Sequence, residues 1–403
     1  MSMQRSIPEQ IQDFLFKTKS KVVWQYLIID FLTGVGTSLF GPIYIIYVSN
    51  YLDPSLILIP NLVFHTTKTL AEYPTGMLAD KFGKKWSTLL GLLGLTISFG
   101  IYGFGSNLIG FAIAEFIGAL ASSFISGALD QWLQEKTDPT TLTKTQSISG
   151  IATKVGSIVS VAILGLFYIP NLSLYWFLAS LVLFLAFLFT LTLEKDQIQW
   201  HHKSTLVAVK AHWKDFKSSP KLVKMTIYES LRYWVEGAGI FMYAALLFTQ
   251  IKHLSIQEMF WVVAIYQTGL MVGNLVGLKS GLTKKISYTW LLLIKAVILS
   301  LMLLVSAWFA VALFVAYEVL ESIMRLKFAD FLNHTVNGNQ NASSLRSLAF
   351  FVTGLGRALG MATMGLVATK FGINGLWLFA AFVLFGLGLS RLKVLTRYFK
   401  CVD

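Results

Sequence analysis

The chain has 403 residues, of which 55% are hydrophobic and only 13% are charged, against roughly 25% charged residues in an ordinary soluble domain. This composition excludes a typical soluble enzyme, because a soluble core could not hide so much apolar surface, and it indicates an integral membrane protein. The single cysteine, Cys401, excludes a disulfide framework and a thiolate metal cluster.

Apolar runs, each long enough for a helix that crosses a bilayer, follow one another along the chain. We count twelve, near residues 23–48, 57–79, 86–105, 107–132, 146–168, 172–193, 224–249, 256–278, 286–305, 307–331, 345–369 and 373–392. The polar first 21 residues do not form a cleavable signal peptide, so we expect the first run to stay in the mature protein. The predicted fold class is an all-α integral membrane protein with 12 transmembrane helices.

The connections between these runs alternate in charge. Odd-numbered connections, such as residues 50–54, are rich in Asn, Pro and Ser, whereas even-numbered ones are basic, as at Lys284 and Lys285. By the positive-inside rule we expect both termini to be cytoplasmic. The net charge of +13 is then explained by orientation and by contact with anionic membrane lipids, and no nucleic-acid partner is expected.

A basic linker, residues 194–223, divides the chain into two halves. Its apolar residues recur at helical spacing, which predicts a helix lying on the membrane surface; they are Leu206, Val209, Trp213 and Phe216. The predicted parts are a cytoplasmic segment, a first bundle, the linker, a second bundle and a cytoplasmic tail. Their limits are 1–22, 23–193, 194–223, 224–392 and 393–403.

The two halves carry matching residues. Glu115 in the fourth run corresponds to Glu318 in the tenth, and Lys154 in the fifth corresponds to Arg357 in the eleventh, each about 200 residues further on. Such agreement indicates a duplication, and hence two pseudo-symmetric bundles of six helices each.

The segment EYPTGMLADKFGKK, residues 72–85, joins the second and third runs. It resembles the signature of the major facilitator superfamily, and SFISGALDQWLQEKT, which ends the fourth run, is similar to a bacterial exporter subgroup of that family. The signature residues are Gly76, Asp80, Lys81, Gly83, Lys84 and Lys85. The resemblance implies secondary transport by two six-helix bundles in a bacterial plasma membrane. Some features depart from it: Ser280 replaces the acid in the second copy, and the fifth run lacks the Gly-Pro pair of many antiporters.

The resemblance also implies a conformational latch. In the family the signature acid docks on the cytoplasmic start of the eleventh run, where free backbone amides favour a negative charge; here this start lies near Ser343, Ser344 and Arg346. The alternative is that Asp80 only helps to set the topology. The latch predicts that Asp80→Asn shifts the protein toward its inward-open state, seen as changed accessibility of cysteine reporters on the two sides.

Charged residues inside apolar runs are the best site candidates, because such charges are costly unless they face a cavity or a partner. The candidate cavity residues are Asp30, Lys68, Glu72, Glu115, Lys154, Arg232, Glu236, Glu318, Glu321 and Arg357. Acids within the runs outnumber bases, and a buried carboxyl group without a cationic partner can carry a proton at physiological pH, which motivates proton coupling.

Spacing suggests how these charges pair. Lys68 and Glu72 are four residues apart and can meet, either as a structural ion pair or in a substrate site. Polar stripes follow from Glu229, Arg232 and Glu236 in the seventh run and from Glu318, Glu321 and Arg325 in the tenth. The duplication suggests acid–base couples of Glu115 with Lys154, and of Glu318 or Glu321 with Arg357. Lys295, in the peripheral ninth run, is expected to face lipid unless it turns toward a neighbour, and His65 to be a packed core residue.

No catalytic, phosphate-binding or metal-binding motif accompanies these charges: GLGRALG, residues 354–360, lies inside an apolar run, and His201 and His202 stand alone. The predicted function is alternating-access transport of a small amphipathic molecule, as proton-coupled export by a monomer that needs no cofactor besides the proton gradient. The alternatives are uptake of an anionic or zwitterionic metabolite and a non-transporting receptor or immunity protein on the same fold.

Overall fold

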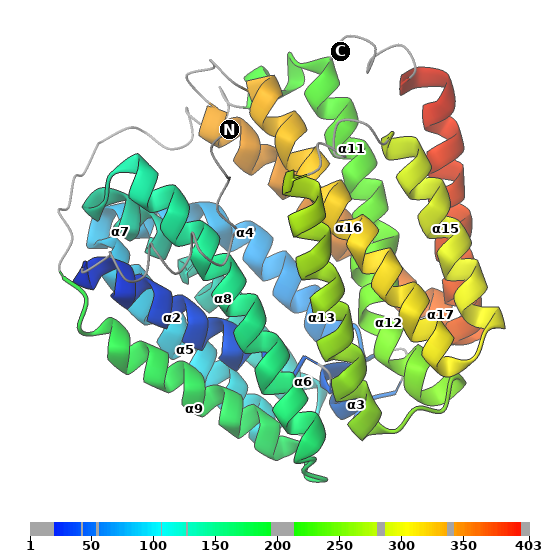
Figure 1. Cartoon of the computed structure of the whole chain (residues 1–403), viewed down its shortest axis with the longest axis horizontal. Helices are drawn as coiled ribbons and strands as arrows, with labels where there is room; N and C mark the ends of the chain where they lie inside the picture. Colours follow the sequence, from blue (N-terminus) through cyan, green and yellow to red (C-terminus); the bar gives the residue numbers. More distant parts are fainter. Residues whose placement is uncertain are drawn as a thin grey trace, which may run out of the picture.

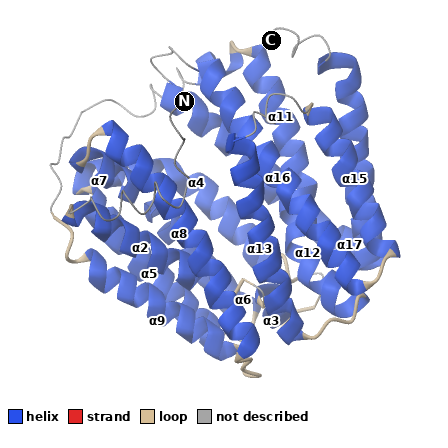
Figure 2. Cartoon of the chain, in the orientation of Figure 1, coloured by secondary structure: helices blue, strands red, loops and turns tan. Residues whose placement is uncertain are grey.

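The structure, a computed structural model, describes residues 20–41, 43–53, 56–105, 107–125, 128–194, 213–279, 287–336 and 342–395. Within these residues the regular structure is helical, without any strand (Figure 2). The predicted all-α fold is therefore confirmed. In the linker, residues 213–217 form helix, whereas Leu206 and Val209 lie outside the described residues.

Helix occupies every predicted apolar run. The helices of the first half are α2 (Lys21–Ser38), α3 (Tyr44–Ser49), α4 (Ile59–Phe82), α5 (Lys84–Phe104), α6 (Leu108–Ile125), α7 (Ala128–Lys136), α8 (Pro139–Leu166) and α9 (Ser173–Thr190). Those of the second half are α11 (Pro220–Val235), η1 (Glu236–Ile240), α12 (Phe241–Leu246), η2 (Leu247–Ile251), α13 (Ile256–Lys279), α15 (Tyr288–Leu304), α16 (Ala307–Val336) and α17 (Ala342–Leu395). Gly372, with φ of 70°, interrupts α17 between the last two runs, because only glycine adopts such a backbone without strain.

Length and apolarity alone mark six helical segments of the described chain as able to cross a membrane; they are Lys84–Phe104, Leu108–Lys136, Ile148–Leu166, Ser173–Thr190, Ala307–Leu332 and Leu348–Ser390. The other runs are divided, short or charged; Tyr288–Leu304, for instance, has 17 residues. Helix α4, for example, contains Lys68 and Glu72 within its length. The count of twelve spans therefore stays a prediction.

The helices form two bundles (Figure 1). In the first bundle, α2 to α9, helix α5 packs on α6 and α9; in the second, α11 to α17, helix α11 packs on α17 and α13 on α16. The bundles contact each other through α8 with α13 and through α4 with α17. These two contacts correspond under the duplication, since the second run matches the eighth and the fifth matches the eleventh.

Two ends of the first bundle can be defined from its side-chain contacts. At the linker end, Lys85 Nζ donates to the carbonyl oxygens of Leu191 at 2.8 Å and Leu193 at 2.5 Å, which ties the start of α5 to the end of α9. At the distal end, the Tyr47 hydroxyl of α3 donates to the carbonyl oxygen of Tyr102 at 2.9 Å and lies 3.2 Å from Ser173 Oγ. This arrangement places α3 over the end of α5 and the start of α9.

Candidate functional site

A cavity of about 380 Å³ lies between the two bundles and is lined by residues of both. Its wall is mainly aromatic and aliphatic. The aromatic residues are Phe40, Tyr44, Phe64, Phe99, Tyr102, Trp176, Phe241, Phe248, Tyr266 and Phe314. Glu115 is the carboxylate in this lining, and neither lysine nor arginine is part of it. The cavity can therefore accept an apolar group and present a single acid to it.

Glu115, on α6, is 9% exposed and is held by hydroxyl groups. The Tyr44 and Tyr102 hydroxyls donate to its Oε1 at 2.8 and 2.7 Å. Asn61 Nδ2 in turn donates to the Tyr44 hydroxyl at 2.7 Å. The Tyr102 ring is fixed by stacking on Trp176, with centroids 4.2 Å apart and planes inclined by 12°. An aromatic frame thus positions this acid, and no cation pairs with it among the described residues.

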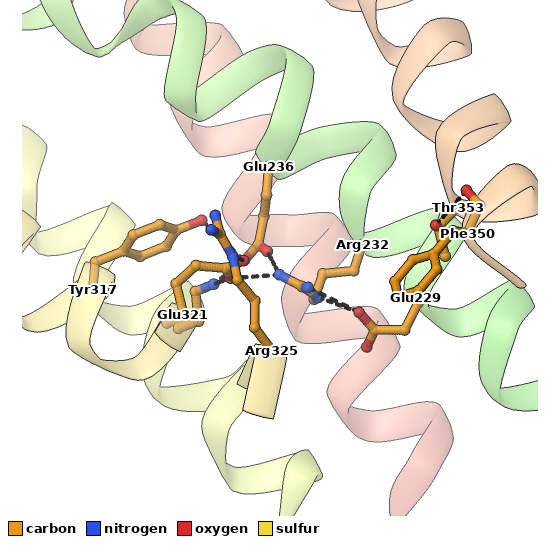
Figure 3. A network of polar contacts seen from close by, with 9 residues as sticks. Glu229, Arg232, Glu236, Tyr317, Glu321, Arg325, Phe350 and Thr353 are labelled. Atoms are coloured by element: carbon orange, nitrogen blue, oxygen red, sulfur yellow. Dashed lines mark hydrogen bonds and ion pairs between the residues drawn. The ribbon is translucent and has the colours of Figure 1, made fainter. Parts of the chain in front are cut away.

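The second bundle holds a different polar centre, which we call the ion-pair network (Figure 3). Its members are three carboxylates, three cations and one tyrosine: Glu229, Glu236, Glu321, Arg232, Lys295, Arg325 and Tyr317. The formal charges of the acids and bases balance.

Arg232 lies at the middle of the ion-pair network. It forms ion pairs with Glu229 at 2.8 Å, with Glu236, and with Glu321 at 2.5 Å. It is 1% exposed, and Glu229 is fully buried. Because each of these buried charges has an opposite charge beside it, the network avoids the cost of an unpaired ion in a low dielectric.

Lys295 joins the same network from α15. Its Nζ lies 2.5 Å from Glu236 Oε1 and 2.7 Å from Glu321 Oε2, and 4.2 Å from the centroid of the Tyr317 ring. Of the two alternatives expected for Lys295, facing lipid or turning toward a neighbour, the structure shows the second: the side chain is fully buried, because α15 turns this face toward α16, on which it packs.

The predicted couples between helices do not form. Lys154 donates to Gln267 Oε1 of α13 at 3.2 Å, across the two bundles, and not to Glu115. Arg357 pairs with neither predicted acid: Glu321 is shared by Arg232, Lys295 and Arg325, and Glu318, which is 3% exposed, has no ion pair with it. The couples that the duplication suggested are therefore absent among the described residues.

The remaining candidates lie apart from the network. Asp30 of α2 accepts hydrogen bonds from the hydroxyls of Ser149 and, at 3.1 Å, Thr153, both on α8. Lys68 and Glu72, whose spacing allows an ion pair, do not form one. Glu72 is exposed, and Lys68 Nζ lies 6.0 Å from the Phe64 ring centroid.

The signature residues lie in the last turns of α4, at Gly83 between the helices and at the start of α5. Gly83 has φ of 102° there, which explains why glycine stands at this position, and α5 begins at Lys84. A β-carbon on Gly76 would meet no other atom within 4 Å. Lys81 Nζ lies 5.2 Å from the Phe82 ring centroid. The side chains of Asp80, Ser343, Ser344 and Arg346 lie outside those described, so the latch stays a prediction.

Sequence analysis missed the residues that hold Glu115. Tyr44, Asn61 and Tyr102 were absent from the predicted site, and so was Trp176. The available signal was Asn61, an amide inside an apolar run. Within the described residues no group of three or more His, Cys, Asp or Glu side chains could hold a metal ion.

Comparisons with known proteins give one family. The model of the Major Facilitator Superfamily matches residues 26–361. An uncharacterized MFS-type transporter of Methanocaldococcus jannaschii is 27% identical over 138 residues, which cover 34% of each chain. The uncharacterized MFS-type transporter YxaM of Bacillus subtilis is 29% identical over 103 residues, 25% of this chain and 26% of YxaM. The chain thus matches about a third or less of the length of these relatives.

Solved structures share the fold over nearly the whole chain. The nucleoside transporter NupG has a TM-score of 0.76 at 16% identity, covering 93% of this chain and 99% of that one. A POT family transporter in complex with 5-aminolevulinic acid has a TM-score of 0.73 at 13% identity, covering 92% of this chain and 95% of that one. A bacterial homolog of the human lysosomal transporter Spinster, inward-facing and unoccupied, has a TM-score of 0.71 at 13% identity, covering 98% of this chain and 97% of that one. At these identities the likeness concerns the fold alone.

Proposed function

The chain belongs to the major facilitator superfamily, and from this premise we propose that it is a secondary active transporter that exports a small amphipathic solute in exchange for protons. The two bundles would rock about the cavity between them, opening it to one side of the membrane at a time. The superfamily assignment supports transport, and the lining of the cavity supports a small amphipathic solute.

The observation that carries the proposal is Glu115 in the cavity wall. Its partners are the hydroxyls of Tyr44 and Tyr102, which can hydrogen-bond to a carboxylate and also to a carboxylic acid. Within the described residues it has no ion pair, so gaining a proton breaks none. A carboxyl group in this setting can bind a proton when the cavity is dry and release it when water enters.

The cavity supports an amphipathic solute. Its volume of about 380 Å³ lies within the range of roughly 300 to 1,000 Å³ that small-molecule pockets usually have. Stacked and edge-on aromatic rings, such as Trp176 against Phe40 at 4.4 Å between centroids, offer flat apolar surfaces, while Asn61 and Ser98 add polar atoms to the lining. An apolar body with a few polar groups fits this wall.

The test is proton flux into proteoliposomes that contain the purified protein, with an imposed pH gradient and a panel of lipophilic cations, antibiotics, peptides and sugars. We expect a solute of the panel to evoke proton flux in the wild type and none in Glu115→Gln. The matched control is Glu135→Gln, which removes an exposed acid of α7 and should keep the flux.

Flux in Glu115→Gln equal to that of the wild type would exclude this residue as the proton site. Proton movement in the same direction as the solute would indicate uptake in place of export. Silence of the folded wild type over the whole panel would favour the non-transporting receptor or immunity protein.

A further inference from the structure

Two cations for which the described residues show no ion pair lie on α4 and α17, two helices at which the bundles touch. Lys68 belongs to α4 and Arg357 to α17. Their neighbours show how close the helices are, since a β-carbon on Gly354 would lie 3.0 Å from Thr69 Oγ1. The charges of Lys68 and Arg357 repel each other, and both act on His65. Positive charge therefore gathers on the two sides of this contact.

Neither cation is satisfied within the described chain. The Nε atom of Arg357 is buried without a hydrogen-bond partner, and its guanidinium carbon lies 4.8 Å from the Tyr233 ring centroid. Lys68 Nζ lies over the Phe64 ring, and Glu72 attracts it only from beyond ion-pair distance. This differs from the ion-pair network, in which every cation has a carboxylate partner.

The surroundings of Arg357 do not compensate its charge. Arg232 and Arg325 add to the repulsion, whereas Glu321 attracts it. Glu321, however, is already shared by three nearer cations. An unpaired cation at membrane depth is costly and marks a functional site by default. Here the missing partner is an anion.

This cationic contact adjoins the cavity. His65 and Phe64 line the cavity, and Lys68 follows His65 by one helical turn on α4. A solute with its apolar body among the aromatic rings could therefore extend an anionic group toward Lys68 and Arg357. A planar guanidinium is suited to carboxylate and phosphate oxygens, because it can donate two parallel hydrogen bonds.

We propose that Lys68 and Arg357 form a subsite for an anionic group, a carboxylate or a phosphate, of the solute that the cavity binds. The inference rests on the proposed function only where it calls the bound molecule a transported solute. The subsite itself concerns binding. Because one cation belongs to each bundle, a bound anion removes the repulsion between the bundles. The anion is thus held more tightly when the two bundles are together, which is the differential affinity that a ligand needs to shift a conformational equilibrium.

The experiment compares three probes with the same phenyl group by calorimetric titration of the full-length protein in lipid nanodiscs. They are 4-phenylbutyrate, 3-phenylpropyl phosphate and the neutral 4-phenylbutyramide. The wild type should bind at least one anion about tenfold or more tightly than the amide, a difference of about 1.4 kcal/mol. The two anions distinguish a carboxylate subsite from a phosphate subsite.

Lys68→Gln and Arg357→Gln should each lose most of this preference while binding the amide as before, which shows that the variant is folded. The matched control is Lys370→Gln, which removes an exposed charge from the same helix as Arg357 and should keep the preference. Equal affinities of the wild type for the anions and the amide, or no detectable binding of any probe, would overturn the subsite. A preference for the anion kept by the double variant, Lys68→Gln with Arg357→Gln, would overturn it as well.

The outcome is separate from that of the flux measurement. An anion preference without substrate-evoked flux would leave the subsite standing and remove the transport proposal. Flux evoked by neutral or cationic solutes, in a protein without anion preference, would do the reverse.

Discussion

The two bundles bury carboxylates in different ways. In the first, Glu115 lies in the cavity wall and is held by two tyrosine hydroxyls. In the second, Glu236 and Glu321 lie among cations in the ion-pair network, and neither lines the cavity. A carboxyl group that is held by neutral donors can change its charge locally, whereas one that is shared by several cations cannot do so without disturbing all of them. The duplication thus kept helices in equivalent places while the chemistry of their acids diverged.

Breaking the ion-pair network should have the largest effect. Arg232→Met leaves three buried carboxylates with two cations, and removing one partner of a buried ion pair costs about 3 to 5 kcal/mol. We expect a loss of this size in the free energy of unfolding, measured by denaturant titration in detergent micelles. Lys370→Met, which removes an exposed cation, should stay within about 0.5 kcal/mol.

A double variant sharpens this result. Adding Glu229→Gln to Arg232→Met restores the charge balance and should recover part of the lost stability, since neighbours in one network are not additive. If the two losses simply add, the network is not the reason for the destabilisation.

The close packing of the second bundle can be tested at Gly356. A β-carbon at this position would lie 2.2 Å from the backbone oxygen of Ser230, so Gly356→Ala must push α17 away from α11. We expect a cost of about 1 to 3 kcal/mol in the free energy of unfolding. Gly386→Ala, in the same helix but with open space around it, should be neutral or stabilising by up to about 1 kcal/mol. Equal effects at both positions would contradict this account.

The acid in the first bundle should be less sensitive to the loss of one partner. Tyr44→Phe removes a hydrogen bond to Glu115 and the acceptor of Asn61, but Tyr102 still donates at 2.7 Å. We expect a loss of about 1 to 2 kcal/mol in the free energy of unfolding. Tyr168→Phe, in which no side-chain hydrogen bond is lost within the described residues, serves as control. A loss as large as that of Arg232→Met would remove the contrast between the bundles.

The smallest expected effect concerns the polar contact between the bundles. A double-mutant cycle with Lys154→Met and Gln267→Ala should give a coupling energy of about 0.6 kcal/mol, the usual value for a single hydrogen bond between membrane helices. A coupling of several kcal/mol would place this hydrogen bond beside the ion-pair network in importance.

Pairs at helical spacing could be predicted from the sequence, and three of them are present. Arg232 meets Glu229 and Glu236, three and four residues away, and Arg325 meets Glu321. Lys68 and Glu72 have the same spacing as Glu321 and Arg325, yet they remain apart. Helical periodicity therefore makes such a contact possible, and the surrounding helices decide whether it forms.

Pairs between helices could not be predicted. The partners of Glu115 come from two other helices, Tyr44 from α3 and Tyr102 from α5; Asn61 of α4 supports Tyr44. Lys295 reaches acids of η1 and α16. The backbone also departs from a regular helix at Glu236, where η1 begins. A π-helix changes the direction of the side chains that follow it, and an α-helical periodicity cannot foresee this change.

The amino-acid sequence by itself determined that the protein is helical and membrane-embedded, that it is duplicated, and that its buried charges are the residues to examine. These properties depend on composition and on periodicity along one helix, which local sequence specifies. Only the tertiary structure decided which charges are neutralised and which are not, as between Arg232 and Arg357. That outcome depends on how each helix is rotated about its axis and which neighbour it touches, and both are set by the packing of the whole chain.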